Sequence, residues 1–155
     1  MVQIDVQTLL IVATAILGLL GGMFVAAWWR ERESSDLAWW GVGLLSVVPG
    51  VAMIAMRGAI PDWLSIGLAN ALVLLGYGCM AAGAFAFDGG RLPRALVPAG
   101  AAIWVAACQV PTFFGDFPTR VATVSLIAAA YGTGVAVGLW RGRRVVALPS
   151  RRAAV

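Results

Sequence analysis

Long apolar runs separated by short polar connections dominate the pattern of this chain. Each run is about 20 residues or longer, the length that an α-helix needs to cross the hydrocarbon core of a bilayer. The pattern predicts an all-α fold, a polytopic transmembrane helix bundle with one domain over residues 1–144. Residues 145–155 are predicted to form a basic cytoplasmic tail, which could lead into a further span. The five predicted spans lie at about 6–29, 37–56, 63–87, 95–114 and 120–140.

The stretch 56–70 is the sharpest polar interruption, and it predicts a tight turn between the second and third spans. Arg57 ends one apolar run, and Pro61 and Asp62 precede the next. Proline suits a first helical turn because its missing N–H would have no partner there, and an acidic side chain suits the positive end of the helix dipole. Asn70 then places a polar amide inside the third span.

Trp63, Asn70 and Tyr77 are spaced seven residues apart, which places them on one stripe of a helix. An amide in hydrocarbon usually faces the bundle interior and finds a partner. Asn70 is therefore expected to make an interhelical hydrogen bond or to contact a ligand, and the hydrogen bond is favoured. The candidate cue-sensing or structural polar residues are Arg57, Asp62, Asn70 and Tyr77.

Charged residues at the predicted outer ends of the spans could form a small rim above a cleft that contains Asn70 and Tyr77. The favoured alternative is that they are solvated loop charges, whose surface ion pairs contribute about 0–1 kcal/mol each. The rim residues are Asp5, Arg57, Asp62, Asp116 and Arg120.

Composition supports a membrane protein and excludes several kinds of chemistry. The chain is 61% hydrophobic and 12% charged, against about 45–50% and 25% in soluble domains. It contains neither histidine nor lysine, which removes histidine metal ligands, histidine bases and lysine Schiff bases. Cys79 and Cys108 lie in apolar runs without ligand spacing and are expected to be buried thiols. No charged residue lies near the middle of a predicted span, which argues against a proton relay or an ion-driven transporter. No set of residues with catalytic spacing is visible, so we predict no enzyme activity, cofactor or metal in this chain.

The distribution of arginine predicts the orientation of the spans. Connections on the side of the C-terminus carry nine arginines and connections on the other side carry two. The positive-inside rule then places the N-terminus outside and the C-terminus in the cytoplasm. The excess arginine is interpreted as a membrane signal and not as a nucleic-acid surface. The nine are Arg30, Arg32, Arg91, Arg94, Arg141, Arg143, Arg144, Arg151 and Arg152, and the two are Arg57 and Arg120.

Small residues recur at helical spacing on the first and fifth predicted spans. Such faces let a neighbouring backbone approach closely, within one bundle or between two copies. For the GxxxG pair on the first span, packing within one bundle is favoured over self-association. The sets are Gly18 with Gly22; Ala128, Gly132 and Ala136; and Gly134 with Gly138.

Prolines lie near both ends of the fourth predicted span. Pro98 is near its start, where proline is tolerated in a first turn. Pro111 is near its end, and Gln109 could either satisfy a carbonyl group freed by that proline or line a cleft.

A resemblance to a known family rests mainly on the element Arg57-Gly58-x-x-Pro61-Asp62-Trp63-x-Ser65-Ile66-x-x-Ala69-Asn70. With this element the chain resembles, over nearly its whole length, the multi-pass N-terminal membrane region of bacterial diguanylate cyclases that carry a GGDEF output domain. Shorter elements agree: Thr8-Leu9, Trp39-Trp40-Gly41, Phe85-x-Phe87-x-Gly89 and Leu139-Trp140-Arg141-Gly142-Arg143.

The resemblance implies a sensory and anchoring input module of the bacterial inner membrane. Such a module would regulate a cytoplasmic cyclase that makes cyclic di-GMP from GTP. The chain has no GGDEF motif, so the resemblance places the output domain in sequence beyond Val155. The expected partners are the lipid bilayer and that output domain, with no nucleic acid. Two alternatives stay open, namely a small transporter or channel subunit and a purely structural membrane component.

Overall fold

The structure is a computed structural model, and it describes residues 6–142. Within that range the chain is helical, with short turns and an isolated bridge between Arg57 and Ile60, so the predicted all-α class is confirmed. Asp5 of the predicted rim and the predicted tail at 145–155 lie outside the described residues. The elements are α1 (Val6–Arg30), α2 (Ser35–Ala55), the π-helix η1 (Trp63–Leu68), α3 (Ala69–Phe87), the 3-10 helix η2 (Arg94–Leu96), α4 (Ala99–Ala107), α5 (Pro111–Gly115) and α6 (Phe117–Gly142).

Four helical stretches of the described chain are long and apolar enough to cross a membrane. They coincide with the first, second, third and fifth predicted spans, and they support a membrane protein. These stretches are Thr8–Arg30, Ser35–Ala55, Trp63–Phe87 and Phe117–Trp140.

The fourth predicted span, at about 95–114, is not one continuous helix in the structure. The segment forms η2, α4 and α5, with turns near Pro98 and at residues 108–110. Proline has no N–H to donate to the preceding turn, so Pro98 and Pro111 each interrupt helical hydrogen bonding. Val110 is extended, with φ −90° and ψ 114°, as the residue before a proline tends to be. The longest piece, α4, has nine residues, too few to cross a bilayer alone.

Side chains satisfy the backbone groups that these breaks expose. The Tyr131 hydroxyl, from α6, lies 2.7 Å from Leu96 O and 3.0 Å from Val97 O, and it accepts from Gly100 N at 3.0 Å. At the second break Gln109 Nε2 donates to Val105 O at 3.1 Å. Gln109 thus bonds to a carbonyl group near the break, but not to the one that Pro111 deprives of a donor: Ala107 O accepts from Val110 N at 3.0 Å. Non-helical backbone is tolerated in membrane proteins where other groups provide such partners.

Tyr131→Phe is expected to destabilise the protein by about 1–2 kcal/mol, because backbone groups at the first break lose their partner. Unfolding in mixed detergent, followed by tryptophan fluorescence, measures the change. Tyr77→Phe is the matched control: Tyr77 is 41% exposed, so its loss should stay within about 0.5 kcal/mol. Equal losses in the two variants would contradict the role given to the Tyr131 hydroxyl.

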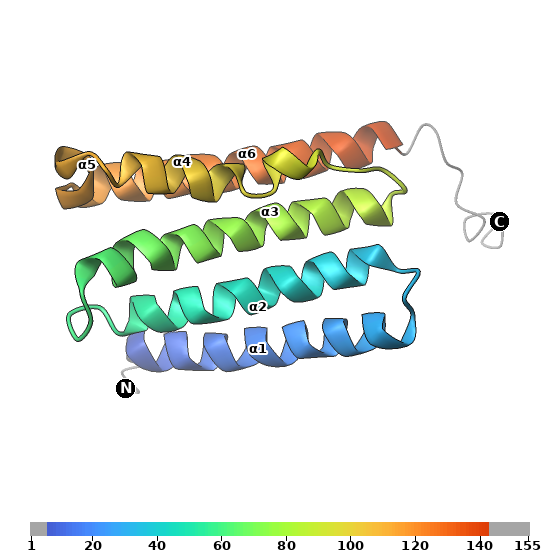
Figure 1. Cartoon of the computed structure of the whole chain (residues 1–155), viewed down its shortest axis with the longest axis horizontal. Coiled ribbons are helices and arrows are strands. Elements are labelled where there is room, and N and C mark those ends of the chain that lie inside the picture. Colours follow the sequence, from blue (N-terminus) through green and yellow to red (C-terminus); the bar gives the residue numbers. More distant parts are fainter. Residues whose placement is uncertain (1–5, 143–155) are drawn as a thin grey trace, which may run out of the picture.

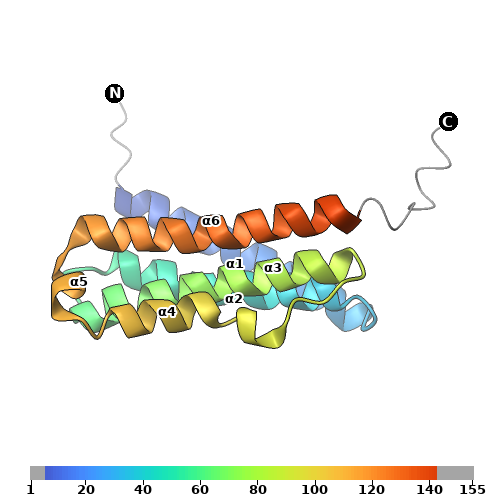
Figure 2. The same cartoon turned by 90° about the horizontal axis from the view of Figure 1, so that it is seen from above.

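The central helix of the bundle is α3. It packs most extensively against α2 and also contacts α4 and α6, while α1 packs against α2. Successive long helices run in opposite directions, and the broken segment 94–115 travels the length of the bundle beside α6 (Figures 1 and 2). The connections 31–34 and 88–93 therefore share one end, which we call the loop end (Figure 1). The turn 56–62 and Asp116 share the other, which we call the turn end.

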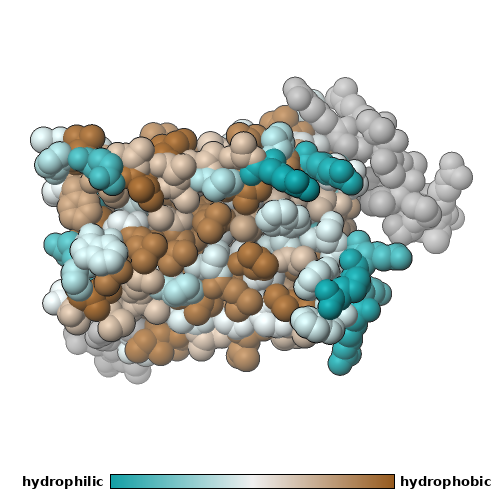
Figure 3. Space-filling view, viewed as in Figure 1, coloured by the Kyte–Doolittle hydropathy of each residue, from teal (hydrophilic) through white to brown (hydrophobic). Residues whose placement is uncertain are grey.

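Apolar side chains cover the outer faces of the bundle. Leu19 on α1 and Leu126 on α6 are 71% and 70% exposed, and such faces fit contact with lipid better than contact with water. Hydrophilic residues gather toward the two ends, with apolar residues between them (Figure 3). At the loop end the Arg32 guanidinium lies 4.6 Å and 4.5 Å from the ring centroids of Trp28 and Trp29, an arrangement typical of a membrane interface.

Within one bundle Gly18 and Gly22 do not bring two helices into close contact, so the favoured of the two interpretations is not what the structure shows, and self-association through this pair stays a prediction. A Cβ on Gly22 would meet no atom of the described residues within 4 Å, and one on Gly18 would meet Val48 at an ordinary 3.8 Å. The close contact is at Gly21, where a Cβ would lie 2.9 Å from Leu45 Cγ on α2. The GxxxG spacing shows that two small residues share a face, but the rotation of α1 is set by how its whole length packs on α2.

Only some of the small residues on α6 allow a close contact with another helix. A Cβ on Gly138 would lie 2.6 Å from the Phe85 ring, so this position allows close packing on α3. Cβ atoms on Gly132 and Gly134 would meet no atom of the described residues within 4 Å. The predicted self-association through this face stays a prediction.

Candidate functional site

The turn between α2 and α3 is formed as predicted. Gly58 has φ +90°, a backbone conformation that favours glycine. Pro61 O accepts from Leu64 N at 3.0 Å and from Ser65 N at 3.2 Å, so helical structure follows the proline directly. The unpredicted feature is that Trp63–Leu68 is a π-helix. Such segments are frequent at functional sites because their wider turns leave backbone groups free.

Side-chain N–H groups donate hydrogen bonds to carbonyl groups of η1. Ile66 O accepts from Asn70 Nδ2 at 2.8 Å and from Trp104 Nε1 at 3.2 Å, and the same Nε1 lies 3.0 Å from Gly67 O. The prediction that Asn70 bonds to another helix is therefore wrong, because its partner lies four residues back along the same stretch. The interhelical bond to this carbonyl group comes from Trp104 on α4.

Trp104 is a deeply buried residue of this site, and it was not among the residues predicted for it. It is 1% exposed and packs with Ile66, Ala71 and Leu74 in a buried cluster. Its ring meets that of Phe113 edge to face, with centroids 5.4 Å apart. One signal was available: Trp104 lies in the middle of an apolar run, where an indole N–H needs an acceptor inside the protein.

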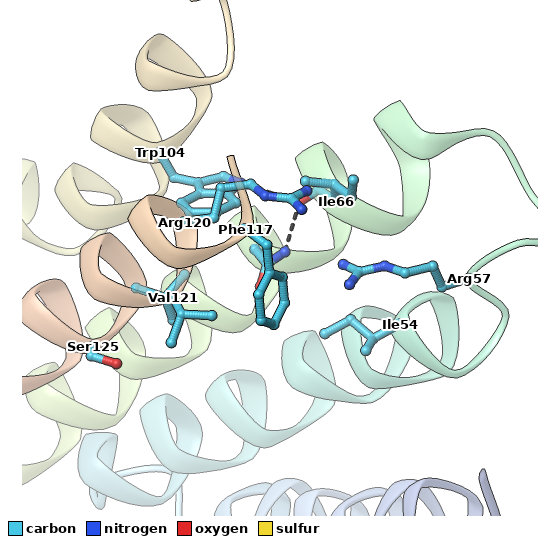
Figure 4. A pocket seen from close by; sticks show the side chains of 10 residues that line it. Ile54, Arg57, Ile66, Trp104, Phe117, Arg120, Val121 and Ser125 are labelled. Atoms are coloured by element: carbon cyan, nitrogen blue, oxygen red, sulfur yellow. Dashed lines mark hydrogen bonds between the residues drawn. The ribbon is translucent and has the colours of Figure 1, made fainter. Parts of the chain in front are cut away.

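A cavity of about 230 Å³ opens beside Asn70 at the turn end (Figure 4). It lies between the end of α2, the η1–α3 stretch, α4 and the start of α6. Apolar side chains and the Trp104 ring form much of its wall, while Arg57, Arg120, Asn70 and Ser125 supply polar groups. Figure 4 shows the side chains of Arg57 and Arg120 extending into this region from opposite sides.

Arg120 is packed at this site without being neutralised. Its guanidinium lies 5.8 Å from the Phe117 ring centroid, and its Nε and Nη1 are buried with no hydrogen-bond partner among the described residues. The Asp116 carboxylate accepts instead from the backbone N of Thr119 at 3.1 Å and from the Thr119 hydroxyl, which caps the start of α6. The site therefore holds charged donors that the described protein groups leave unused.

The structure brings together two of the four candidate residues. Arg57 and Asn70 line the cavity, whereas Asp62 is exposed before η1 and Tyr77 is 41% exposed farther along α3. The expectation of one cleft containing Asn70 and Tyr77 is wrong. Seven residues separate them by about 10 Å along the helix axis, and the cavity is confined to the turn end. Of the described rim residues, Arg57 and Arg120 meet at the cavity.

Asn70→Leu is expected to cost only about 0.5–1.5 kcal/mol of stability, because the lost bond is intrahelical and Trp104 still donates to Ile66 O. The unfolding assay in mixed detergent measures it. Thr14→Val is the control, since Thr14 makes the same kind of side-chain bond, to Leu10 O at 2.7 Å, on α1. A loss above about 3 kcal/mol for Asn70→Leu alone would indicate a partner on another helix.

The chain matches no protein-family model, no curated protein and no solved structure. The resemblance to the membrane regions of diguanylate cyclases therefore stays a prediction.

Proposed function

We propose that this chain is a membrane-embedded sensory and anchoring module whose cue-sensing part is the cavity beside Asn70. The cavity itself carries the proposal. It is bounded by separate elements, namely the α2 end, η1, α4 and α6, so a ligand inside it would contact all of them at once. A ligand that binds one arrangement of these elements better than another shifts the protein toward that arrangement.

The proposed membrane arrangement is five crossings of a bacterial inner membrane, with the N-terminus outside and the C-terminus in the cytoplasm. Two observations support it. Segment 94–115 travels between the two ends of the bundle although it is broken (Figure 1). The arginine-rich connections share the loop end, while Arg57 and Arg120 lie at the turn end. The cavity would then face the outer side.

The continuous helix α6 provides a route from the cavity to the cytoplasm. Arg120, Val121 and Ser125 near its start line the cavity, and the helix continues without a break to Gly142. Helix shifts of about 1–2 Å are common in switching proteins. A displacement of the start of α6 on ligand binding would be transmitted along its axis to the loop end.

The proposed output is a diguanylate cyclase, and this part of the proposal rests on the resemblance alone. Reading the gene past the codon for Val155 tests it: an in-frame GGDEF segment would support a fused cyclase, and a stop codon there would contradict one.

A functional test follows in cells that express the whole reading frame. Arg57→Gln should change the cellular level of cyclic di-GMP at equal membrane abundance, whereas Arg30→Gln, at the loop end, should not. If both variants match the wild type while purified protein shows saturable flux in liposomes, the sensory proposal fails and transport is favoured.

A further inference from the structure

We propose that the turn-end cavity binds a small organic anion, recognised by its carboxylate or phosphate group, through Arg57 and Arg120. This inference deepens the proposed function by naming the ligand class, and it rests on that function only in taking the cavity as the sensing site. The charge, the hydrogen-bonding capacity and the size of the cavity each support it.

The charge of the cavity selects an anion. The described residues that line it include Arg57 and Arg120 and no acidic residue. Two guanidinium groups beside one cavity repel each other, and burial of charged donors without partners is unfavourable. Nε and Nη1 of Arg120 are such donors. An anion between the two side chains would relieve both effects.

The geometry of the donors suits a planar or tetrahedral oxyanion. A guanidinium presents its N–H groups as a fork that matches the oxygens of carboxylate and phosphate groups. Among the described residues, Arg57 is held only by a 3.4 Å contact from Nη2 to Ser65 O, longer than the roughly 3.2 Å limit of a good N–H···O bond. Arg57 could therefore turn to a ligand at little cost. The Ser125 side chain, also on the wall, adds a hydroxyl donor.

The size and walls of the cavity limit the rest of the ligand. A volume of about 230 Å³ is below the roughly 300–1,000 Å³ of sites for drug-sized molecules, so the ligand is small. Ile54, Phe117 and Val121 on the wall favour a short apolar body attached to the charged group. Such a group could belong to a free small molecule or to a lipid whose headgroup reaches the cavity from the membrane surface.

Calorimetric titration of the purified chain in a neutral detergent tests whether the ligand is a free small molecule. Benzoate and phenyl phosphate are the probes, and benzamide is the uncharged control. We expect saturable binding of at least one anion and none of benzamide. Arg57→Gln and Arg120→Lys should each weaken binding by at least about tenfold, because the first removes a charged donor and the second removes the paired N–H groups of the guanidinium. Arg120→Lys keeps the positive charge and removes only the forked guanidinium, so it should disturb folding little. Arg30→Gln, at the loop end, is the control and should bind as the wild type does.

Reconstitution tests the lipid source. The chain is placed in phosphatidylcholine nanodiscs with or without phosphatidylglycerol, and lipids retained after detergent extraction are counted by mass spectrometry. Retained phosphatidylglycerol that is lost in Arg57→Gln and Arg120→Lys, but not in Arg30→Gln, would support the proposal with a headgroup phosphate as the ligand.

Two results would overturn the anion site. One is the absence of anion binding together with the absence of phosphatidylglycerol retention, and the other is unchanged binding and retention in both arginine variants. These measurements need no cyclase, so they separate the two proposals. Anion binding without any effect on cyclic di-GMP would refute the sensory role and leave the site intact.

Discussion

Gly78→Ala is expected to destabilise the bundle by roughly 2–3 kcal/mol, because the new methyl group has no room. Its Cβ would overlap Val97 O and would lie 2.9 Å from Val97 C and 3.2 Å from the Tyr131 hydroxyl. The Val97 carbonyl group is held by Tyr131 at 3.0 Å, so it cannot move aside without losing that bond. Helix α3 and the segment before α4 would have to separate.

Gly132→Ala is the matched control for this prediction. It makes the same chemical change inside α6, where a Cβ would meet no atom of the described residues within 4 Å. Because alanine is the better helix former, we expect no loss and a gain of up to about 1 kcal/mol. Unfolding in mixed detergent measures both variants. If Gly78→Ala were as stable as Gly132→Ala, the close approach of Val97 to α3 would be refuted.

Trp104→Ala is expected to lower stability by about 3–5 kcal/mol, because Trp104 is the largest of the fully buried side chains in the described residues. The change empties a fully buried volume and removes the donor to Ile66 O and Gly67 O. Since Trp104 is the main link between α4 and η1 in the described chain, its loss should also detach α4 from the turn end.

Trp104→Phe separates packing from hydrogen bonding. Phenylalanine keeps an aromatic ring against Phe113 but has no N–H, so we expect an intermediate loss of about 1–3 kcal/mol. Trp63→Ala is the control, because Trp63 is 63% exposed at the turn end and should change stability little. Losses of similar size for Trp63→Ala and Trp104→Ala would contradict the anchoring role of Trp104.

The helical class and the four long helices of the described chain could be predicted from the sequence, because they depend on hydropathy and length, which are local properties. The turn at Gly58 and Pro61 could be predicted for the same reason, since glycine and proline restrict the backbone wherever they occur. The break in segment 94–115 was not predicted, although Pro98 and Pro111 stand in the sequence near its two ends. Apolar residues between the prolines match a membrane span equally well whether the helix is continuous or not.

Contacts between helices could not be predicted from the local pattern of the sequence. The choice of Gly21 over Gly18 and Gly22 depends on the rotation of α1 against α2. The partner of Asn70 depends on η1, whose shifted hydrogen bonds leave no trace in hydropathy. The cavity needs both Arg57 and Arg120 in its wall, although they are distant in the chain.

The central claim is that the chain crosses the membrane five times, and the broken segment 94–115 is the part that decides it. Single cysteines at Ala59, Gly90 and Gly115, in a background with Cys79→Ala and Cys108→Ala, test it by labelling with a membrane-impermeant maleimide. We expect Ala59→Cys and Gly115→Cys to react from the outer side of intact spheroplasts, and Gly90→Cys only after the membrane is permeabilised. If Gly90→Cys and Gly115→Cys reacted from the same side, segment 94–115 would not cross, and the account of the cavity as an outward-facing sensor would be contradicted.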